Sequence, residues 1–121
     1  MADLAQIGVT DDNLKCLDLL KEKGYFDEIQ EAARFAASIA IRKKLYEGKD
    51  LLKVGTKLNT RWNTSLVDPD NFLRNIVKYF GLCPANYDIG LRSLIILGLD
   101  YIYEKIKNTD EILLGSLFDG K

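Results

Sequence analysis

Residues 24–45, GYFDEIQEAARFAASIAIRKKL, decide the fold because they hold the longest clean helical pattern in the chain. Apolar side chains recur there at intervals of three and four residues, which is the spacing of one helix face. Most of them are alanines, so a neighbouring backbone can approach this helix closely. We therefore predict the central helix of the fold here, packed on more than one side. Its apolar residues are Ile29, Ala32, Ala33, Ala36, Ala37, Ala40 and Ile41.

Both ends of this helix carry residues that are typical of helix ends. Asp27 is followed three residues later by Gln30, which is the spacing of a capping box. Arg42, Lys43 and Lys44 come in the last turn, where the helix dipole favours positive charge. The pattern therefore predicts both helix ends and places cations at the carboxyl end.

The composition is that of one small folded domain. The chain has 121 residues, of which 47% are hydrophobic, and its net charge is −1. This length suits a single core, and this hydrophobic content argues against disorder. No apolar run approaches the ~18 residues of a membrane span, and the start MADLAQIGV lacks the features of a signal peptide. We expect a soluble, cytoplasmic protein with no membrane contact.

Histidine is absent from the sequence, and this bears on catalysis. It removes the usual general base, the commonest metal ligand and the usual partner of a catalytic serine or cysteine. No motif for carboxylate or lysine catalysis stands in its place. We expect a protein that is not an enzyme and that uses no cofactor or metal. Cys16 falls within the apolar pattern of its helix, so we interpret it as a small core residue.

Charge is unevenly distributed along the chain. Acids are in excess in residues 1–40, whereas bases are in excess in residues 41–80. The middle third of the chain can therefore present a basic face, although the whole chain is not basic. The cations that would form this face are Arg42, Lys43, Lys44, Lys57 and Arg61.

A short strand and a helix are predicted before the central helix. In LAQIGVT, residues 4–10, Ile7 and Val9 share one side and the residues between them share the other. Aspartates at positions 11 and 12 offer N-caps for a helix that runs to about residue 23. Gly24 then ends that helix.

This order of a short strand, an acidic cap, a helix, a glycine and a longer helix resembles the ribbon-helix-helix DNA-binding domain. In that family, two chains pair their strands into a ribbon that enters the major groove. The resemblance covers the first third of the chain. It implies that Gln6, Gly8 and Thr10 face DNA and that the amides of residues 27–29 face phosphate. A weaker similarity links residues 25–40 to small accessory proteins of bacterial DNA-modification and phage-defence systems.

Residues 48–67 are predicted to be a connection, because they are rich in threonine and asparagine and show no helical pattern. Trp62 lies in this connection, and two interpretations of it stay open. Beside Lys57 and Arg61 it can stack on a nucleic-acid base. Alternatively, it fills the side of the core.

A second pair of helices follows the connection. Asp68 and Pro69 are a strong helix start, with a cap residue and then proline at the first helical position. The last long helix is apolar over most of its circumference and must be buried, so we expect a homodimer. Gly98 within it is predicted to be a close contact between helices. The apolar face of the preceding helix is predicted to hold Phe72, Leu73, Ile76, Val77 and Phe80.

The two halves of the chain share a pattern. DDNLKCLDLLKEKG and DPDNFLRNIVKYFG each precede a further helix, and both halves have an extended piece before them. If the chain is a tandem repeat, residues 61–67 can pair with residues 4–10 within one chain. If the likeness is only that of two amphipathic hairpins, it has no such consequence.

The predicted fold is mainly α: a single helical domain, residues 1–121, of two helical hairpins with a short N-terminal β-strand. Its parts are a strand-helix-helix-like half (1–47), a connection (48–67), a second helical hairpin (68–108) and a tail (109–121). We expect a small non-enzymatic DNA-associated protein that is a ribbon-helix-helix-like transcriptional regulator. The alternative is a protein-interaction or assembly subunit of a bacterial or phage system, without direct contact with nucleic acid. The predicted DNA-binding residues are Gln6, Thr10, Arg42, Lys43, Lys44, Lys57 and Arg61.

Overall fold

The computed structural model describes residues 6–49, 51, 54, 59–63, 67–68, 70, 72–83 and 87–106, and this part is mainly helical, as predicted. None of the helices within these ranges is both long and apolar enough to cross a membrane. The predicted tail, residues 109–121, lies outside them. In chain order, the elements are β1 (Gln6–Val9), α1 (Asp11–Glu22), α2 (Ile29–Arg42), β2 (Asn59–Asn63), α4 (Phe72–Tyr79) and α5 (Tyr87–Ile106).

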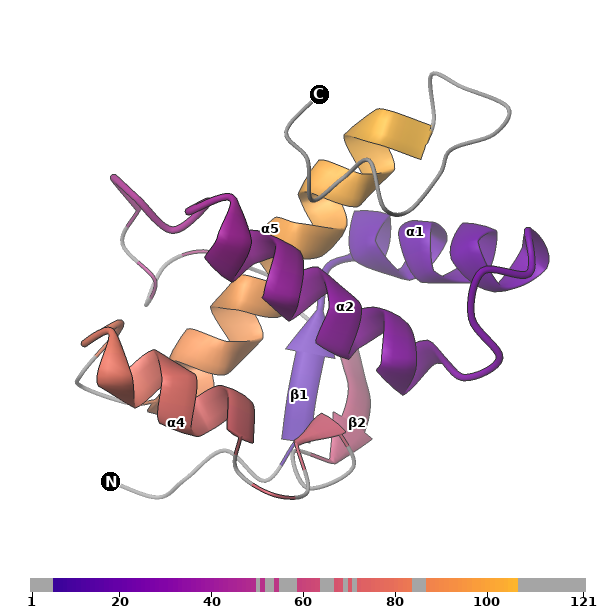
Figure 1. Ribbon diagram of the computed structural model, residues 1–121. Coiled ribbons are helices and arrows are strands. Elements are labelled where there is room, and N and C mark those ends of the chain that lie inside the picture. Colours follow the sequence, from indigo (N-terminus) through magenta and orange to yellow (C-terminus); the bar gives the residue numbers. More distant parts are fainter. Residues whose placement is uncertain are drawn as a thin grey trace.

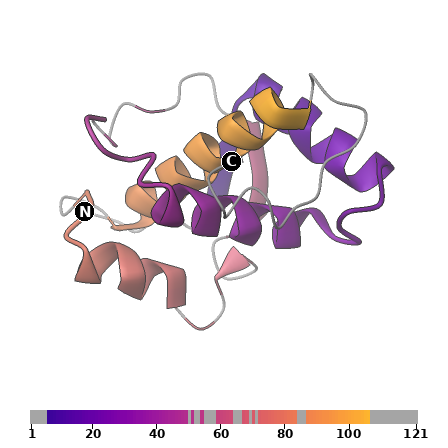
Figure 2. The same cartoon turned by 45° about the horizontal axis from the view of Figure 1, so that its top comes forward.

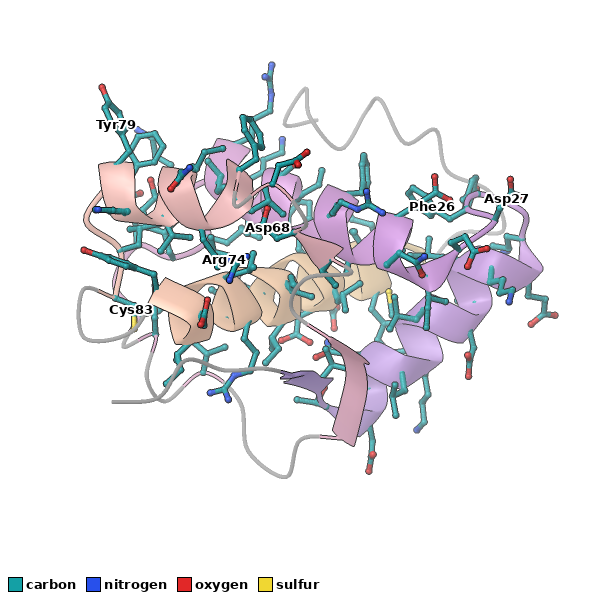
Figure 3. The ribbon with its side chains drawn as sticks, turned by 90° about the horizontal axis from the view of Figure 1, so that it is seen from below. Phe26, Asp27, Asp68, Arg74, Tyr79 and Cys83 are labelled. Atoms are coloured by element: carbon teal, nitrogen blue, oxygen red, sulfur yellow. The ribbon has the colours of Figure 1, made fainter. Side chains whose placement is uncertain are left out.

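The last helix, α5, is the centre of the fold. It contacts α1, α2, α4 and β1, and Figures 1 and 3 show it between α2 and α4 on one side and the two strands on the other. The prediction that α2 is the central helix is therefore wrong. The apolar residues of α2 form a face, whereas those of α5 surround the helix, so α5 is the one that needs neighbours on every side. Its residues that are no more than 1% exposed include Leu91, Leu94, Ile95, Ile96, Leu99 and Ile102.

The burial of α5 bears on the expected homodimer. The sequence predicted a dimer because it was hard to see how one small chain could cover such a helix. The other elements of the same chain cover it, so that reason no longer applies. A homodimer stays a prediction that needs a different surface to support it.

The contact between α2 and α5 is a contact between backbones. A Cβ atom on Gly98 would overlap the carbonyl group of Ala36 and would lie 2.8 Å from its Cα atom. The alanines at positions 32, 33, 36, 37 and 40 of α2 are no more than 1% exposed. The predicted close contact at Gly98 is confirmed, because small residues on both helices let the two backbones meet.

The two strands pair with each other in antiparallel orientation and form a two-stranded ribbon. One strand comes from each half of the chain, so the pairing within one chain that follows from a tandem repeat is observed. The second strand lies slightly earlier in the sequence than predicted. The register shifts between Ile7 and Gly8, which leaves Arg61 as the extra residue of a bulge. The paired residues are Gln6 and Asn63, Ile7 and Trp62, Gly8 and Thr60, and Val9 and Asn59.

The helix starts differ slightly from the predicted ones. Helix α1 is capped by Thr10 rather than by the aspartates that follow it. The Thr10 hydroxyl accepts the N–H of Asn13 at 3.1 Å, and the Thr10 N–H donates to the Asn13 side-chain oxygen at 3.1 Å. Helix α2 is capped one residue after Asp27, where the N–H of Glu28 donates to the carboxylate of Glu31 at 3.2 Å. Reciprocal pairs of this kind satisfy amides that the first turn leaves open.

We predict that Gly98→Ala destabilises the protein by about 3 kcal/mol, because the added methyl group forces α2 and α5 apart. Gly90→Ala is the matched control within the same helix. A Cβ atom there would lie 2.8 Å from Cγ1 of Val77 and 3.2 Å from Cβ of Cys83, which are side-chain atoms and not backbone, and alanine gains about 1 kcal/mol over glycine in a helix. Urea unfolding of the two variants measures the difference. A Gly98→Ala protein as stable as Gly90→Ala would contradict the backbone contact.

Candidate functional site

The ribbon brings together three of the predicted DNA-binding residues. Gln6 is paired with Asn63, Arg61 is the bulged residue of β2, and Thr10 directly follows β1. Gln, Asn, Arg and Thr are residue types that hydrogen-bond to base edges in the major groove. Thr10 also has a structural role, because its hydroxyl caps α1.

A second cluster of predicted residues lies at the carboxyl end of α2, and we call Arg42, Lys43 and Lys44 the basic turn. Lys44 has a φ of 55°, and the N–H of Leu45 donates to the carbonyl of Ala40 at 2.9 Å. This arrangement ends the helix in a Schellman turn and leaves Arg42 and Lys44 exposed.

The structure does not bring these two clusters together. Figure 1 shows the carboxyl end of α2 on a side of the molecule away from β1 and β2. Lys57, which was predicted to belong to the same basic face, lies outside the described residues. The basic face that the sequence predicted is thus divided into the ribbon, with Arg61, and the basic turn.

The amino end of α2 does not offer the phosphate site that the resemblance implied. The N–H of Glu28 donates to the carboxylate of Glu31. Asp27, which Figure 3 labels beside Phe26, is exposed next to them. Negative charge at this end of the helix disfavours a phosphate, and the carboxylate of Glu31 already accepts one of the amides that would bind it.

Helix α4 carries an apolar face that the core covers only in part. Leu73 and Val77 are buried against the core, but the side chains of Phe72, Tyr79 and Phe80 are 66%, 85% and 52% exposed. The predicted apolar face, with Phe72 and Phe80 on it, is therefore buried only in part. At roughly 100° per residue, the apolar side chains of α4 span an arc wider than one neighbouring helix can cover. Figure 3 shows Tyr79 pointing away from the molecule.

A groove runs along this exposed face, between α2 and α4. It consists of two adjoining hollows of about 360 Å³ each, which share Ser38, Phe72 and Leu73. One hollow is also lined by Arg34, Asp68 and Asp70, and the other by Ile41, Arg42 and Ile76. Figure 2 shows α4 beside α2 here, on the opposite side of the molecule from α1.

A buried ion network fixes α4 on α5. Nε of Arg74 lies 3.0 Å from Oδ2 of Asp68, and its Nη1 lies 3.3 Å from Oδ1 of Asp88. Asp68 also accepts the N–H groups of Leu73 at 3.0 Å and Arg74 at 3.1 Å, so its side chain caps α4. The helix itself begins at Phe72, three residues later than the predicted start at Pro69. Both aspartates are at most 6% exposed. Because one guanidinium binds both buried carboxylates, we interpret the network as structural. Figure 3 shows Asp68 and Arg74 side by side.

The two cysteines differ in their surroundings. Cys16 is 0% exposed within the core, as predicted for a small core residue. Burial, and secondly the charge of Asp100, raise the pKa of the Cys16 thiol to about 12. Cys83 is only half-buried and lies in the connection between α4 and α5, with a φ of 47°.

The described ranges hold no group of three or more Cys, Asp or Glu residues that could bind a metal ion. Family models, curated proteins and solved structures yield no match to this chain. The candidate sites are therefore the ribbon, the basic turn and the exposed face of α4, each defined by its own geometry.

We predict that Arg74→Ala destabilises the protein by about 3–5 kcal/mol, because it leaves two buried carboxylates without their cation. Lys78→Ala on the same helix is the control, since Lys78 is exposed; its effect should stay within ~0.5 kcal/mol. Urea unfolding at neutral pH compares the two. Equal stabilities would mean that the ion network does not hold α4 in place.

We predict that Cys83, but not Cys16, reacts with a thiol reagent such as Ellman's reagent in the folded protein at pH 8. A raised pKa lowers the thiolate fraction at a given pH, so Cys16 should react more slowly by a factor on the order of 100 or more. Cys83→Ala should remove the fast reaction, and Cys16→Ala should leave it. Fast modification of Cys16 would show that α1 opens readily from α5.

Proposed function

We propose that this chain is a small, non-enzymatic DNA-associated protein that carries both strands of a DNA-binding ribbon itself. The observation that supports the proposal is the antiparallel pairing of β1 with β2. Each strand is followed along the chain by two described helices: α1 and α2 in one half, α4 and α5 in the other. In the ribbon-helix-helix domains that the sequence resembles, two chains supply these parts. Here the two halves of one chain would take their places.

The arrangement of the second helices also favours two related halves. The second helix of one half, α2, crosses the second helix of the other, α5, at Ala36 and Gly98. Both residues lie near the middle of their helices, and Figure 1 shows the crossing above the ribbon. A two-fold relation between the halves predicts such a crossing, because each helix must meet its counterpart at the axis.

The proposed interface uses the residues of the ribbon for base contacts. Gln6, Arg61 and Asn63 are of types that hydrogen-bond to base edges, and a bulge of the kind found at Arg61 often re-aims a side chain. The basic turn would act at longer range by attracting the phosphate backbone. In this proposal, Arg61 contributes to the choice of sequence and the basic turn contributes to affinity for any DNA.

Fluorescence anisotropy with labelled duplex DNA at ~50 mM salt tests the proposal. Arg61→Ala should weaken binding to a selected sequence by about tenfold or more and should relax the choice of base. The double variant Lys43→Ala with Lys44→Ala should weaken binding to all sequences to a similar extent and should reduce its dependence on salt. The proposal is abandoned if neither duplex nor single-stranded DNA binds under these conditions.

One observation favours the second function, that of a protein-interaction or assembly subunit. Phe72, Tyr79 and Phe80 are all exposed on α4 and at its carboxyl end, and Phe72 also lines the groove between α2 and α4. Aromatic side chains clustered in this way mark protein interfaces more often than they mark free surface. This function needs no contact with DNA, and the two are compatible because they use different faces of the molecule.

A further inference from the structure

We propose that the exposed face of α4 binds the same face of a second copy of this chain. The face, which we call the α4 stripe, consists of Phe72, Ile76, Tyr79 and Phe80. In the proposed dimer, the two α4 helices pack antiparallel across a two-fold axis that passes near Ile76. The proposal is independent of DNA binding, because the ribbon lies elsewhere on the molecule.

The α4 stripe is a fixed surface that its own chain leaves largely open. The aromatic rings of Tyr79 and Phe80 contact each other edge to face, with centroids 5.4 Å apart. Arg74, paired with Asp68 and Asp88, fixes the helix that carries them. Ordered aromatic side chains lose little freedom when a partner covers them, so little of the binding free energy is spent on ordering.

The spacing of the stripe is self-complementary. Phe72, Ile76 and Phe80 recur every four residues, so they form a ridge of the kind that packs between helices. When two such ridges run antiparallel about Ile76, Phe72 of one copy lies against Phe80 of the second copy. Ile76 then meets its own counterpart at the axis. A two-fold interface requires such a pattern, in which the same patch serves as both partners.

The charges at the two ends of the groove favour the antiparallel direction. At the amino end of α4, the exposed carboxylate of Asp70 lines the groove beside Arg34, and Asp68 is paired with Arg74. At the other end, Arg42 lines the groove. Antiparallel packing places Asp70 of each copy towards Arg42 of the other. Parallel packing would place the two Arg42 side chains together, which electrostatic complementarity disfavours.

The size of the stripe predicts a weak dimer. An aromatic side chain buries about 150–250 Å² when fully covered, so three partly exposed ones offer roughly 300–500 Å² per copy. The total then lies at the low end for specific interfaces. We therefore expect a monomer at low concentration and a dimer with a Kd on the order of 10 µM.

Sedimentation velocity of the full chain, from about 1 µM to about 500 µM, tests the dimer. The wild type should shift from monomer to dimer over this range. Tyr79→Lys should weaken the dimer at least about tenfold, because it places a charge in the interface. Asp18→Lys, which adds the same side chain to the exposed face of α1, should leave the Kd unchanged. A monomer at every concentration, or a dimer that Tyr79→Lys does not weaken, overturns the proposal.

A cysteine at the axis tests the antiparallel direction. In a Cys83→Ala background, Ile76→Cys should form a disulfide-linked dimer on mild oxidation, because position 76 meets itself. Asp18→Cys in the same background should remain monomeric on a denaturing gel. A failure of Ile76→Cys to cross-link at concentrations where the dimer forms overturns the antiparallel arrangement.

The outcomes separate this proposal from the proposed function. A protein that binds DNA but stays monomeric would support the ribbon proposal and would show that the α4 stripe does not bind a second copy of the chain. A dimer that Tyr79→Lys disrupts, in a protein that does not bind DNA, supports the α4 stripe and removes the ribbon proposal.

Discussion

The approach of two backbones at Ala36 and Gly98 is the constraint on which the rest of the structure depends. Helices whose axes come this close cannot carry larger side chains at the crossing, and both sequences provide small residues there. The crossing fixes the angle and depth at which α2 lies on α5. The remaining faces of α5 then determine where α1, α4 and β1 pack. The position of the ribbon follows, because β1 is held against α5 and β2 is paired with β1.

Helix α4 is attached in a different way. Its buried side chains are Leu73 and Val77, and its orientation is fixed by the charges of Asp68, Arg74 and Asp88. A helix held by a few contacts and an ion network can expose a wide apolar face and still keep one orientation. The groove beside α2 is therefore a preformed surface, which lowers the cost of binding a partner.

The sequence predicted the features that short-range pattern controls. The period of residues 24–45 identified α2, and glycine within an apolar helix identified the contact at Gly98. The predicted N-caps of α1 and α2 lie one or two residues from the observed ones, Thr10 and Glu28. In the sequence, the neighbouring aspartates are equally good cap residues, and only the reciprocal hydrogen bonds in the structure distinguish them. These errors are local and leave the elements unchanged.

The sequence could not predict how many other elements pack against each apolar helix face. Periodicity showed that α4 and α5 are both broadly apolar, but the covered fraction of each arc depends on packing between distant parts of the chain. For this reason α5 was expected to need a second chain, and the exposure of Phe72 and Phe80 on the apolar face of α4 was not foreseen. Packing between distant parts of the chain also separates Arg61 from the basic turn, because basic residues that are close in the sequence need not be close in space.

The covalent connection between the two strands of the ribbon has a further consequence. A ribbon assembled from identical chains is symmetric and falls apart on dilution, whereas this one forms at any concentration and its strands, QIGV and NTRWN, differ in sequence. Under the proposed function, the DNA site of this ribbon need not be palindromic. Each strand is also free to diverge without altering the other, so a single substitution changes one strand of the ribbon instead of both.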